Sequence, residues 1–164
     1  MGHPTIYPTG VTVYNPEKCW NGFTIFQALE VGAVLMNMNG RENKVWKGVH
    51  GFPNKLFPGG YLMTSRGSRD GRYGVQDGLD LVQIDWDGNV VWKFDRNEYI
   101  EDPGIPGRWM ARSHHDYQRE GSTTGYYAPG MEPKTDSGNT HVLAQRNAPN
   151  PKISLKHLLH DVIL

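Results

Sequence analysis

Two stretches of the chain repeat the same order of strand, glycine turn and strand, and this repeat limits the possible folds more than any other feature. The first stretch is Val34–Lys47 and the second is Leu81–Lys93. Trp46 and Trp92 hold matching places in them, 46 residues apart. In the second copy Asp87-Gly88 supplies the positive φ of a tight hairpin. The spacing is typical of one four-stranded blade of a β-propeller.

A second unit follows each hairpin and consists of a histidine, a strand, a glycine turn and a strand. It begins at His50 in the first copy and at His115 in the second. The turn of the second copy is enlarged to residues 118–137, whose Gly, Pro, Ser and Thr content predicts a surface loop. Equivalent positions on successive blades face one central channel, so the two imidazoles are expected to converge there.

The predicted fold class is all-β, because Gly (20), Pro (11), Tyr (8) and Trp (5) favour short aromatic strands joined by turns. We expect a partial β-propeller of about two to three antiparallel meander blades, a fragment of a six-bladed propeller. Strands are expected at residues 10–14 and 22–27, a loop at 101–113 and one short helical turn at 152–159. A small sandwich or meander that ends naturally is the alternative fold.

The repeats divide the single predicted domain, 1–164, into four parts. These parts are entry strands (1–30), a first repeat (31–79), a second repeat with long loops (80–160) and the start of the next blade (161–164). Asp161–Leu164 matches Asp80–Gln83, which opens the preceding hairpin. The chain therefore reads as the incomplete N-terminal part of a propeller, and its open sheet edges predict self-association.

Composition excludes several functional classes. Lys plus Arg and Asp plus Glu both total 17, so no net charge directs the chain to nucleic acid or to an anionic membrane. No apolar run is long enough to span a bilayer. Cys19 is the only cysteine, and the histidines lack metal-ligand spacing, so no metal site is predicted. The first residues do not form a secretory signal, which leaves the compartment undetermined.

Two segments resemble the N-terminal part of the bacterial arylsulfotransferase family. They are residues 10–26 (GVTVYNPEKCWNGFTIF) and the series from LDLVQIDWDGNVVWKF (79–94) to RWMARSHHD (108–116). The hairpin followed by a His-His-Asp unit is the most specific part of this similarity. The resemblance implies sulfuryl transfer from an aryl sulfate ester to a phenol through a transiently sulfated histidine, with no metal or nucleotide cofactor. It also implies that this histidine lies beyond residue 164, and that family members are often exported to the periplasm.

The candidate residues follow from the histidine units and the resemblance. The predicted catalytic residues are His115, His50 and Arg112, and the predicted substrate-binding residues are His114, Asp116, Trp109, Tyr126 and Tyr127. An imidazole can move the phenol proton, a guanidinium can hold the sulfuryl oxygens, and aromatic faces can hold the phenol.

Each candidate also has a structural interpretation. The histidines could cap strand ends, and only one of two adjacent histidines can face inward from a regular strand. Asp116 could bond a turn backbone, and Arg112, like Arg108 and Arg119, could form a surface salt bridge. The loop aromatics could pack the loops down, and Trp46, Trp86 and Trp92 are assigned to sheet packing.

Two other functions remain open at the level of sequence. A propeller fragment can bind a ligand or a protein without catalysis, because the fold does not determine the chemistry. Quinoprotein-like oxidoreductases also repeat tryptophan and glycine at blade turns, but they need a carboxylate set for calcium, and none is visible in the sequence. The predicted partners are therefore small molecules, an aryl sulfate and a phenol. If the chain is an incomplete arylsulfotransferase, it is expected to be weak or inactive by itself.

Overall fold

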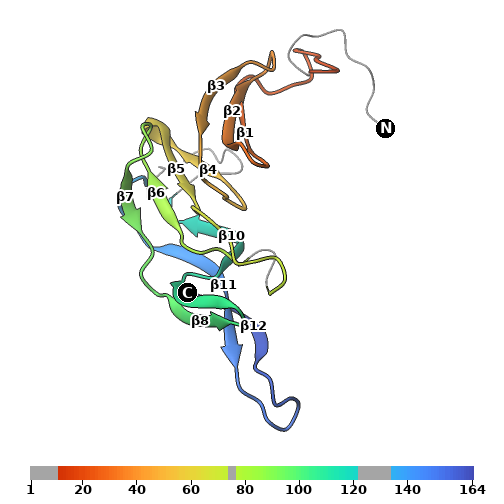
Figure 1. Cartoon of the computed structure of the whole chain (residues 1–164). Helices are drawn as coiled ribbons and strands as arrows, with labels where there is room; N and C mark the ends of the chain where they lie inside the picture. Colours follow the sequence, from red (N-terminus) through yellow and green to blue (C-terminus); the bar gives the residue numbers. More distant parts are fainter. Residues whose placement is uncertain (1–10, 74–76, 122–133) are drawn as a thin grey trace.

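The computed structural model describes residues 11–73, 77–121 and 134–164 and has an all-β architecture, as predicted. Within these residues four small antiparallel sheets follow one another along an elongated molecule (Figure 1). The only helical element described is a single 3₁₀ turn, Pro58–Gly60. The sheets do not close into a barrel.

The first sheet contains β1 (Phe23–Ala28), β2 (Gly32–Asn37) and β3 (Glu42–Trp46), in that order. The hairpin β2–β3 confirms the first predicted repeat hairpin. Gly40 takes φ of +76° in its turn, and the side chain of Asn37 accepts the backbone N–H groups of Asn39 and Arg41. The predicted strand at 22–27 corresponds to β1.

The second sheet is a four-stranded meander whose strands are β4 (Lys55–Phe57), β5 (Tyr61–Thr64), β6 (Val82–Ile84) and β7 (Val90–Lys93). The β6–β7 turn has the predicted chemistry. Gly88 has φ of +91°, and the carboxylate of Asp85 accepts the backbone N–H groups of Asp87 and Asn89. Both histidine units contain their two predicted strands, β4–β5 and β10–β11. The loop predicted at 118–137 is strand at residues 118–119, and its residues 122–133 lie outside the described part of the chain.

The remaining strands form a hairpin and a three-stranded sheet. The hairpin is β8 (Glu98–Asp102) and β9 (Ile105–Met110); the sheet is β10 (Ser113–Arg119), β11 (Thr140–Ala148) and β12 (Leu158–Ile163). The predicted loop at 101–113 is therefore wrong over most of its length. Pro103-Gly104 makes a turn there, and the residues on both sides of it pair as strands.

Two further predictions of local structure are corrected. Residues 11–14 form no strand, and residues 152–159 form a turn and a bend leading into β12, without a helix. The sheets also cut across the predicted repeats, because β4–β5 from the first repeat pair with β6–β7 from the second. Residues 161–163 likewise belong to β12 in the sheet of β10 and β11, so they do not open a new sheet.

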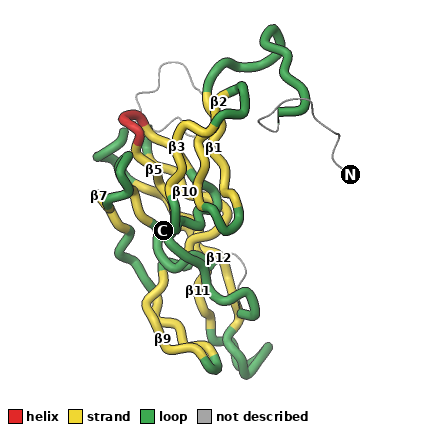
Figure 2. The backbone as a smooth tube through the Cα atoms, turned by 45° about the horizontal axis from the view of Figure 1, so that its top comes forward, coloured by secondary structure: helices red, strands yellow, loops and turns green. Residues whose placement is uncertain are grey.

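The second sheet lies between its two neighbours and contributes to both hydrophobic cores. Alternate residues of a strand face opposite sides. Leu62 of β5 packs with Ala33, Leu35 and Trp46 of the first sheet, and the adjacent Met63 packs with Ala111, Tyr117 and Val142 on the other side. The sheets therefore stack face to face, and Figure 2 shows β3, β5 and β10 in succession.

The tryptophans of the hairpins pack between strands, as predicted. Trp46 is buried, and its indole Nε1 donates to the carbonyl of Asp85 at 3.3 Å. Trp86 is half-exposed and packs edge-on against Trp46, with ring centroids 5.3 Å apart. Trp92 lies beneath the guanidinium of Arg119, on the side of the second sheet that faces the sheet of β10, β11 and β12.

Candidate functional site

A cavity of about 270 Å³ lies where the segments before β4 and after β5 meet the start of β10. His50 and Phe52 line it from the β3–β4 connection, Ser65 from the end of β5, and Ser113 and Tyr117 from β10. The backbone N–H of His50 donates to the carbonyl of Ser65 at 2.7 Å, which holds this connection against β5. His50 therefore lies in a cavity with two residues of β10.

The backbone of β10 is distorted at the histidine pair. Arg112 and His115 have backbone φ angles of +58° and +55°, values that residues other than glycine seldom adopt. The pairing of β10 with β11 shifts register between Ser113 and Tyr117, so a bulge lies at His114–Asp116. Non-glycine residues in this region store strain, which is often found at functional sites.

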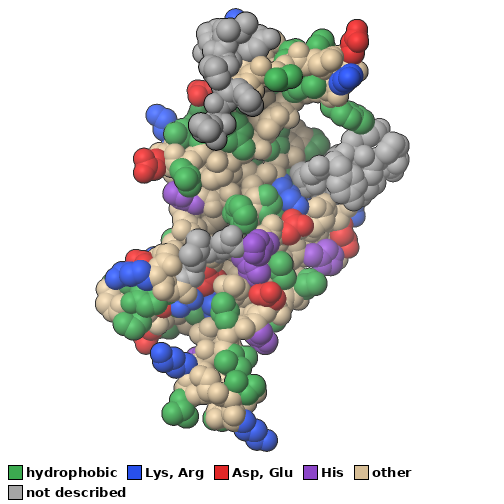
Figure 3. Space-filling model, turned by 90° about the vertical axis from the view of Figure 1, so that its right-hand side faces the viewer, with side chains coloured by type: hydrophobic (Ala, Val, Ile, Leu, Met, Phe, Trp, Pro, Cys, Tyr) green, Lys and Arg blue, Asp and Glu red, His purple; other side chains and the backbone are tan. Residues whose placement is uncertain are grey.

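The bulge places the two adjacent histidines in different environments. His114 is 4% exposed, whereas His115 is exposed to solvent. Their ring centroids are 5.1 Å apart, and the ring of His115 also meets Phe52 edge-on at 5.7 Å. Phe52 lines the cavity, so it connects His115 to the cavity that His50 lines. Histidine side chains are visible on one face of the molecule, with acidic side chains near them (Figure 3).

Asp161 is a residue of this region that the sequence analysis did not identify. Its Oδ1 lies 3.1 Å from Nε2 of His114, although the two atoms do not have hydrogen-bond geometry. The pair crosses the sheet from β10 to β12 over β11. The residues are far apart in sequence, and the only signal at Asp161 was its match to Asp80. Asp80 accepts a hydrogen bond from the backbone N–H of Arg66. The residue that pairs with Asp161 in the corresponding place is Gln145.

His50 and His115 do not occupy equivalent strand positions, contrary to expectation. In the match of Asp80–Gln83 to Asp161–Leu164, Gln83 corresponds to Leu164. Met63 pairs with Gln83 and Val142 pairs with Leu164, so Met63 corresponds to Val142. Lys55 faces Met63 and Tyr117 faces Val142. His50 precedes Lys55 by five positions, whereas His115 precedes Tyr117 by two and lies within the bulge. Phe52 is the residue that connects the two histidines, because it lines the cavity with His50 and its ring contacts that of His115.

Asp116 joins the two sheets. Its Oδ1 accepts from Nζ of Lys55 on β4 at 2.5 Å and from the backbone N–H of Tyr117 at 2.8 Å. Nζ of Lys55 also donates to the carbonyl of Tyr117 at 2.6 Å. The expected bond from Asp116 to a nearby backbone is present, together with an ion pair that fixes β4 against β10.

Arg112 is fully buried in a cluster of charged side chains, so the expected surface salt bridge is wrong. Its Nε lies 3.1 Å from Oδ2 of Asp77, and its Nη1 donates to Glu98 at 2.5 Å and to Asn147 at 2.9 Å. Nη2 is buried and has no hydrogen-bond partner among the described residues. The residue does not line the histidine cavity. Its predicted role toward a sulfuryl group remains a prediction.

The predicted aromatic residues are not gathered around the cavity in the described part of the chain. Trp109 is 67% exposed on β9 and packs edge-on against Tyr99, with ring centroids 5.5 Å apart. It does not line the cavity. Tyr126 and Tyr127 lie outside the described residues. The aromatic rings that line the cavity belong to Phe52 and Tyr117, which the sequence analysis did not propose as substrate-binding residues.

The side-chain donors around the cavity are the imidazole of His50, the amide of Gln27 and several hydroxyls. Ser65, Ser68 and Ser113 line it, and no lysine or arginine among the described residues does. The hydroxyl of Tyr117 donates to the carbonyls of Pro53 and Met63, and burial raises the pKa of this phenol well above its usual value. Across residues 11–73, 77–121 and 134–164, no group of His, Cys, Asp and Glu is arranged to hold a metal ion.

Comparison with protein families, with curated proteins and with solved structures finds no match to this chain. In the part of the chain described here, no helix has the length and apolar character needed to cross a membrane.

Proposed function

We propose that the chain forms an arc of a β-propeller and that its histidine cavity binds an aryl sulfate for sulfuryl transfer to a phenol. The four-stranded meander β4–β7 has the form of one blade, and sheets pack on both of its faces. The single observation that carries the proposed site is the cavity that His50 shares with Ser113 and Tyr117, the residues on either side of the strained bulge of β10.

The residues of the cavity suit the two parts of an aryl sulfate. The ring can lie against Phe52, while serine hydroxyls and imidazole N–H groups can donate to the sulfuryl oxygens. An imidazole at the rim, His50 or His115, can take the proton from an acceptor phenol. By the resemblance, the histidine that forms the covalent sulfuryl bond lies beyond residue 164. We therefore expect this chain to bind an aryl sulfate and to transfer its sulfuryl group slowly or not at all.

Binding and turnover test the proposal separately. Titration with 4-nitrophenyl sulfate should shift the imidazole NMR signals of His50 and His115, and alanine at either position should weaken binding about fivefold or more. His157→Ala is the control, because this exposed histidine precedes β12 and does not line the cavity. Unchanged affinity in both cavity variants would contradict the site. Fast release of nitrophenol in the presence of a phenol would contradict the incomplete-enzyme part of the proposal.

The lack of a cation in the cavity lining favours a second candidate, non-catalytic binding of a neutral ligand. Sulfuryl transfer places charge on the transferring oxygens, and enzymes stabilise such charge with positive or dipolar groups. Here the polar side chains of the described residues that line the cavity are one imidazole, several hydroxyls and the amide of Gln27, and none of them is a lysine or an arginine. Comparison of 4-nitrophenyl sulfate with 4-nitrophenol distinguishes the candidates. Tighter binding of the sulfate ester favours the transferase, and equal or tighter binding of the phenol favours the binding protein.

A further inference from the structure

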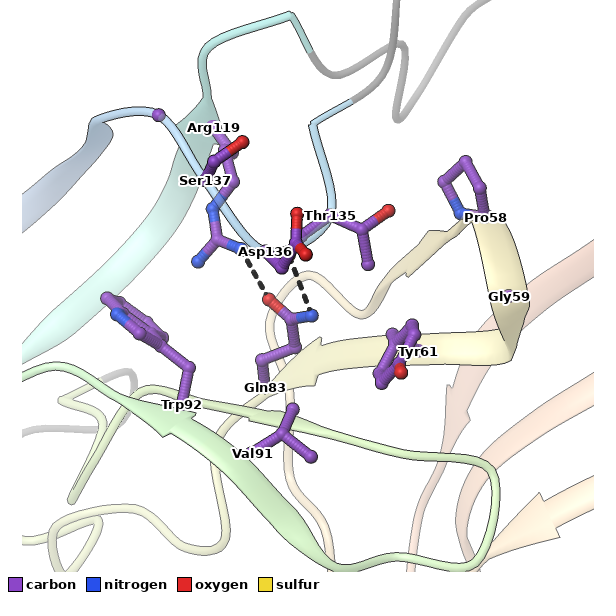
Figure 4. Close-up of a pocket in the computed structure, with 11 residues that line it drawn as sticks. Pro58, Gly59, Tyr61, Gln83, Val91, Trp92, Arg119, Thr135, Asp136 and Ser137 are labelled. Atoms are coloured by element: carbon purple, nitrogen blue, oxygen red, sulfur yellow. Dashed lines mark hydrogen bonds between the residues drawn. The ribbon is translucent and has the colours of Figure 1, made fainter.

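A second and larger cavity, of about 470 Å³, lies at the opposite end of the β4–β5 hairpin from the histidine cavity. Its walls come from the Pro58–Gly60 turn, from β5, β6 and β7, from the end of β10 and from residues 135–138 (Figure 4). Tyr61 and Trp92 supply aromatic surface, and Gln83 lies between them. None of these residues belongs to the proposed histidine site.

Arg119 contributes a buried positive charge to this cavity. The residue is 3% exposed, and no carboxylate lies within ion-pair distance of it among the described residues. Its guanidinium lies over the rings of Trp92 and Phe57, 5.0 and 5.6 Å from their centroids. Removal from water lowers the pKa of Arg119 from its usual value. A buried cation without a counterion is costly, so the cavity favours an anion.

The hydrogen bonds of Arg119 leave one end of its guanidinium available. Nη1 donates to Oε1 of Gln83 and to the carbonyl of Thr135, both at 2.5 Å, and Nε donates to Oγ1 of Thr140 at 3.0 Å. Nε2 of Gln83 donates to the same carbonyl of Thr135 at 2.9 Å. These bonds fix the guanidinium between β6 and the segment that leads into β11. Nη2 donates to no described residue, and Figure 4 shows it on the side of the cavity near Trp92.

We propose that this second cavity binds a small aromatic carboxylate. The carboxylate accepts from Nη2 of Arg119, and the ring lies against Tyr61 and Trp92. A guanidinium suits a carboxylate because it donates directional, charge-assisted hydrogen bonds, and the aromatic walls add stacking contacts. The volume is sufficient for a single substituted ring. Binding involves no covalent step.

The carboxylate of Asp136 provides a second test, because its negative charge should oppose the binding of an anion that Arg119 favours. Asp136 is exposed at the cavity, and its charge acts on Arg119 to raise the guanidinium pKa. It would repel an anionic ligand, although solvent screens much of the effect. Asp136→Asn should therefore strengthen binding of a carboxylate about twofold to threefold, while a neutral ligand of the same shape should bind equally to both proteins.

Binding of benzoate to the full chain tests the proposal, with the indole N–H signal of Trp92 in NMR as the local readout. Benzamide, which lacks the charge, and cyclohexanecarboxylate, which lacks the aromatic ring, should each bind more weakly than benzoate. Arg119→Gln should weaken benzoate about tenfold or more. Trp109→Phe, a change on the exposed face of β9 outside this cavity, should leave binding unchanged.

Arg119 also holds residues 135–140 in place, so its substitution could unfold that segment. Asp136→Asn and Tyr61→Leu change the cavity without removing these hydrogen bonds, and Tyr61→Leu should weaken benzoate relative to cyclohexanecarboxylate. The proposal is overturned if the Trp92 signal does not move, or if benzamide binds as tightly as benzoate. It is also overturned if Asp136→Asn weakens the complex. His50→Ala should leave benzoate binding unchanged, so this test is independent of the histidine site.

Discussion

The guanidinium of Arg112 lies against both carboxylate oxygens of Asp77, with Nε at 3.3 and 3.1 Å, and neither side chain is exposed to solvent. Arg69 shares Asp77 through Nη1 at 2.9 Å and forms two hydrogen bonds with Asp102. The cluster connects the segment before β6 with the end of β8 and the start of β10. A polar network therefore holds β8, which contributes to neither hydrophobic core, against the segment before β6 and the start of β10.

Removal of Asp77 should strongly destabilise the fold. Asp77→Ala leaves two guanidinium groups without their shared carboxylate, and loss of one partner of a buried pair costs about 3–5 kcal/mol. Urea unfolding followed by circular dichroism measures the change. Asp70→Asn is the matched control, because the Asp70–Arg72 pair is exposed and should contribute nothing measurable. Equal stability of the two variants would contradict a structural role for the buried cluster.

A substitution at Gly60 tests how the 3₁₀ turn is packed. Gly60 has φ of +80°, and an added Cβ would lie 2.7 Å from Cε3 of Trp86. Gly60→Ala should reduce the free energy of unfolding by roughly 1–3 kcal/mol through backbone strain and displacement of the ring. At Gly71 the backbone does not require glycine and nothing lies within 4 Å of an added Cβ, so Gly71→Ala should not destabilise the protein. A neutral Gly60→Ala would show that Trp86 moves freely.

Local sequence signals predicted the hairpins well, because turn chemistry and aromatic strands are encoded in adjacent residues. Asp87-Gly88 and Gly40 take the expected turn positions. The β8–β9 hairpin also had a local signal in Pro103-Gly104, and the prediction of a loop overlooked it. Residues 152–159 show the opposite error, since a weak helical pattern gave way to pairing of β12 with β11. Propensity over eight residues does not outweigh a strand partner.

The candidate site was only partly accessible from sequence. The histidine units indicated His50 and His115, but repeat spacing could not reveal a bulge that shifts the register of β10. The proximity of Asp161 to His114 depends on the order of three strands. The burial of Arg112 depends on Asp77, Glu98 and Asn147, each at least 14 positions away in sequence. Contacts of this kind follow from tertiary packing, which the local patterns of a single sequence do not reveal.

The open edge of β12 predicts self-association. Among the described strands β12 pairs only with β11. The backbone hydrogen bonds of Leu164 with Val142 imply that the N–H groups of Leu159, Asp161 and Ile163 point away from β11. Such an edge, with exposed apolar side chains, can pair with a second copy. Ile163→Lys should weaken self-association about tenfold in sedimentation velocity. Leu155→Lys also replaces an exposed apolar side chain, but Leu155 lies before β12, so this change should leave self-association unchanged. A chain that stays monomeric at high concentration would contradict this prediction.

The phenol of Tyr117 should stabilise the fold in a pH-dependent manner. Its hydroxyl donates to the carbonyls of Pro53 and Met63, so Tyr117→Phe leaves two acceptors without a donor and should cost about 1–3 kcal/mol near neutral pH. Burial raises the pKa of Tyr117 above its ordinary value of 10.0. Above that value the unfolded chain loses the proton while the folded protein keeps it, so stability decreases as the pH rises.

The Phe variant lacks this titration. The stability difference between the wild-type protein and Tyr117→Phe should therefore narrow between about pH 9 and pH 11 in urea unfolding experiments. Tyr99→Phe serves as the control, because Tyr99 is half-exposed on β8 and its replacement should leave the alkaline dependence unchanged. A difference that stays constant across this range would mean that the Tyr117 hydroxyl is open to water. In that case Tyr117, which lines the histidine cavity from β10, would be less tightly packed than its two hydrogen bonds indicate.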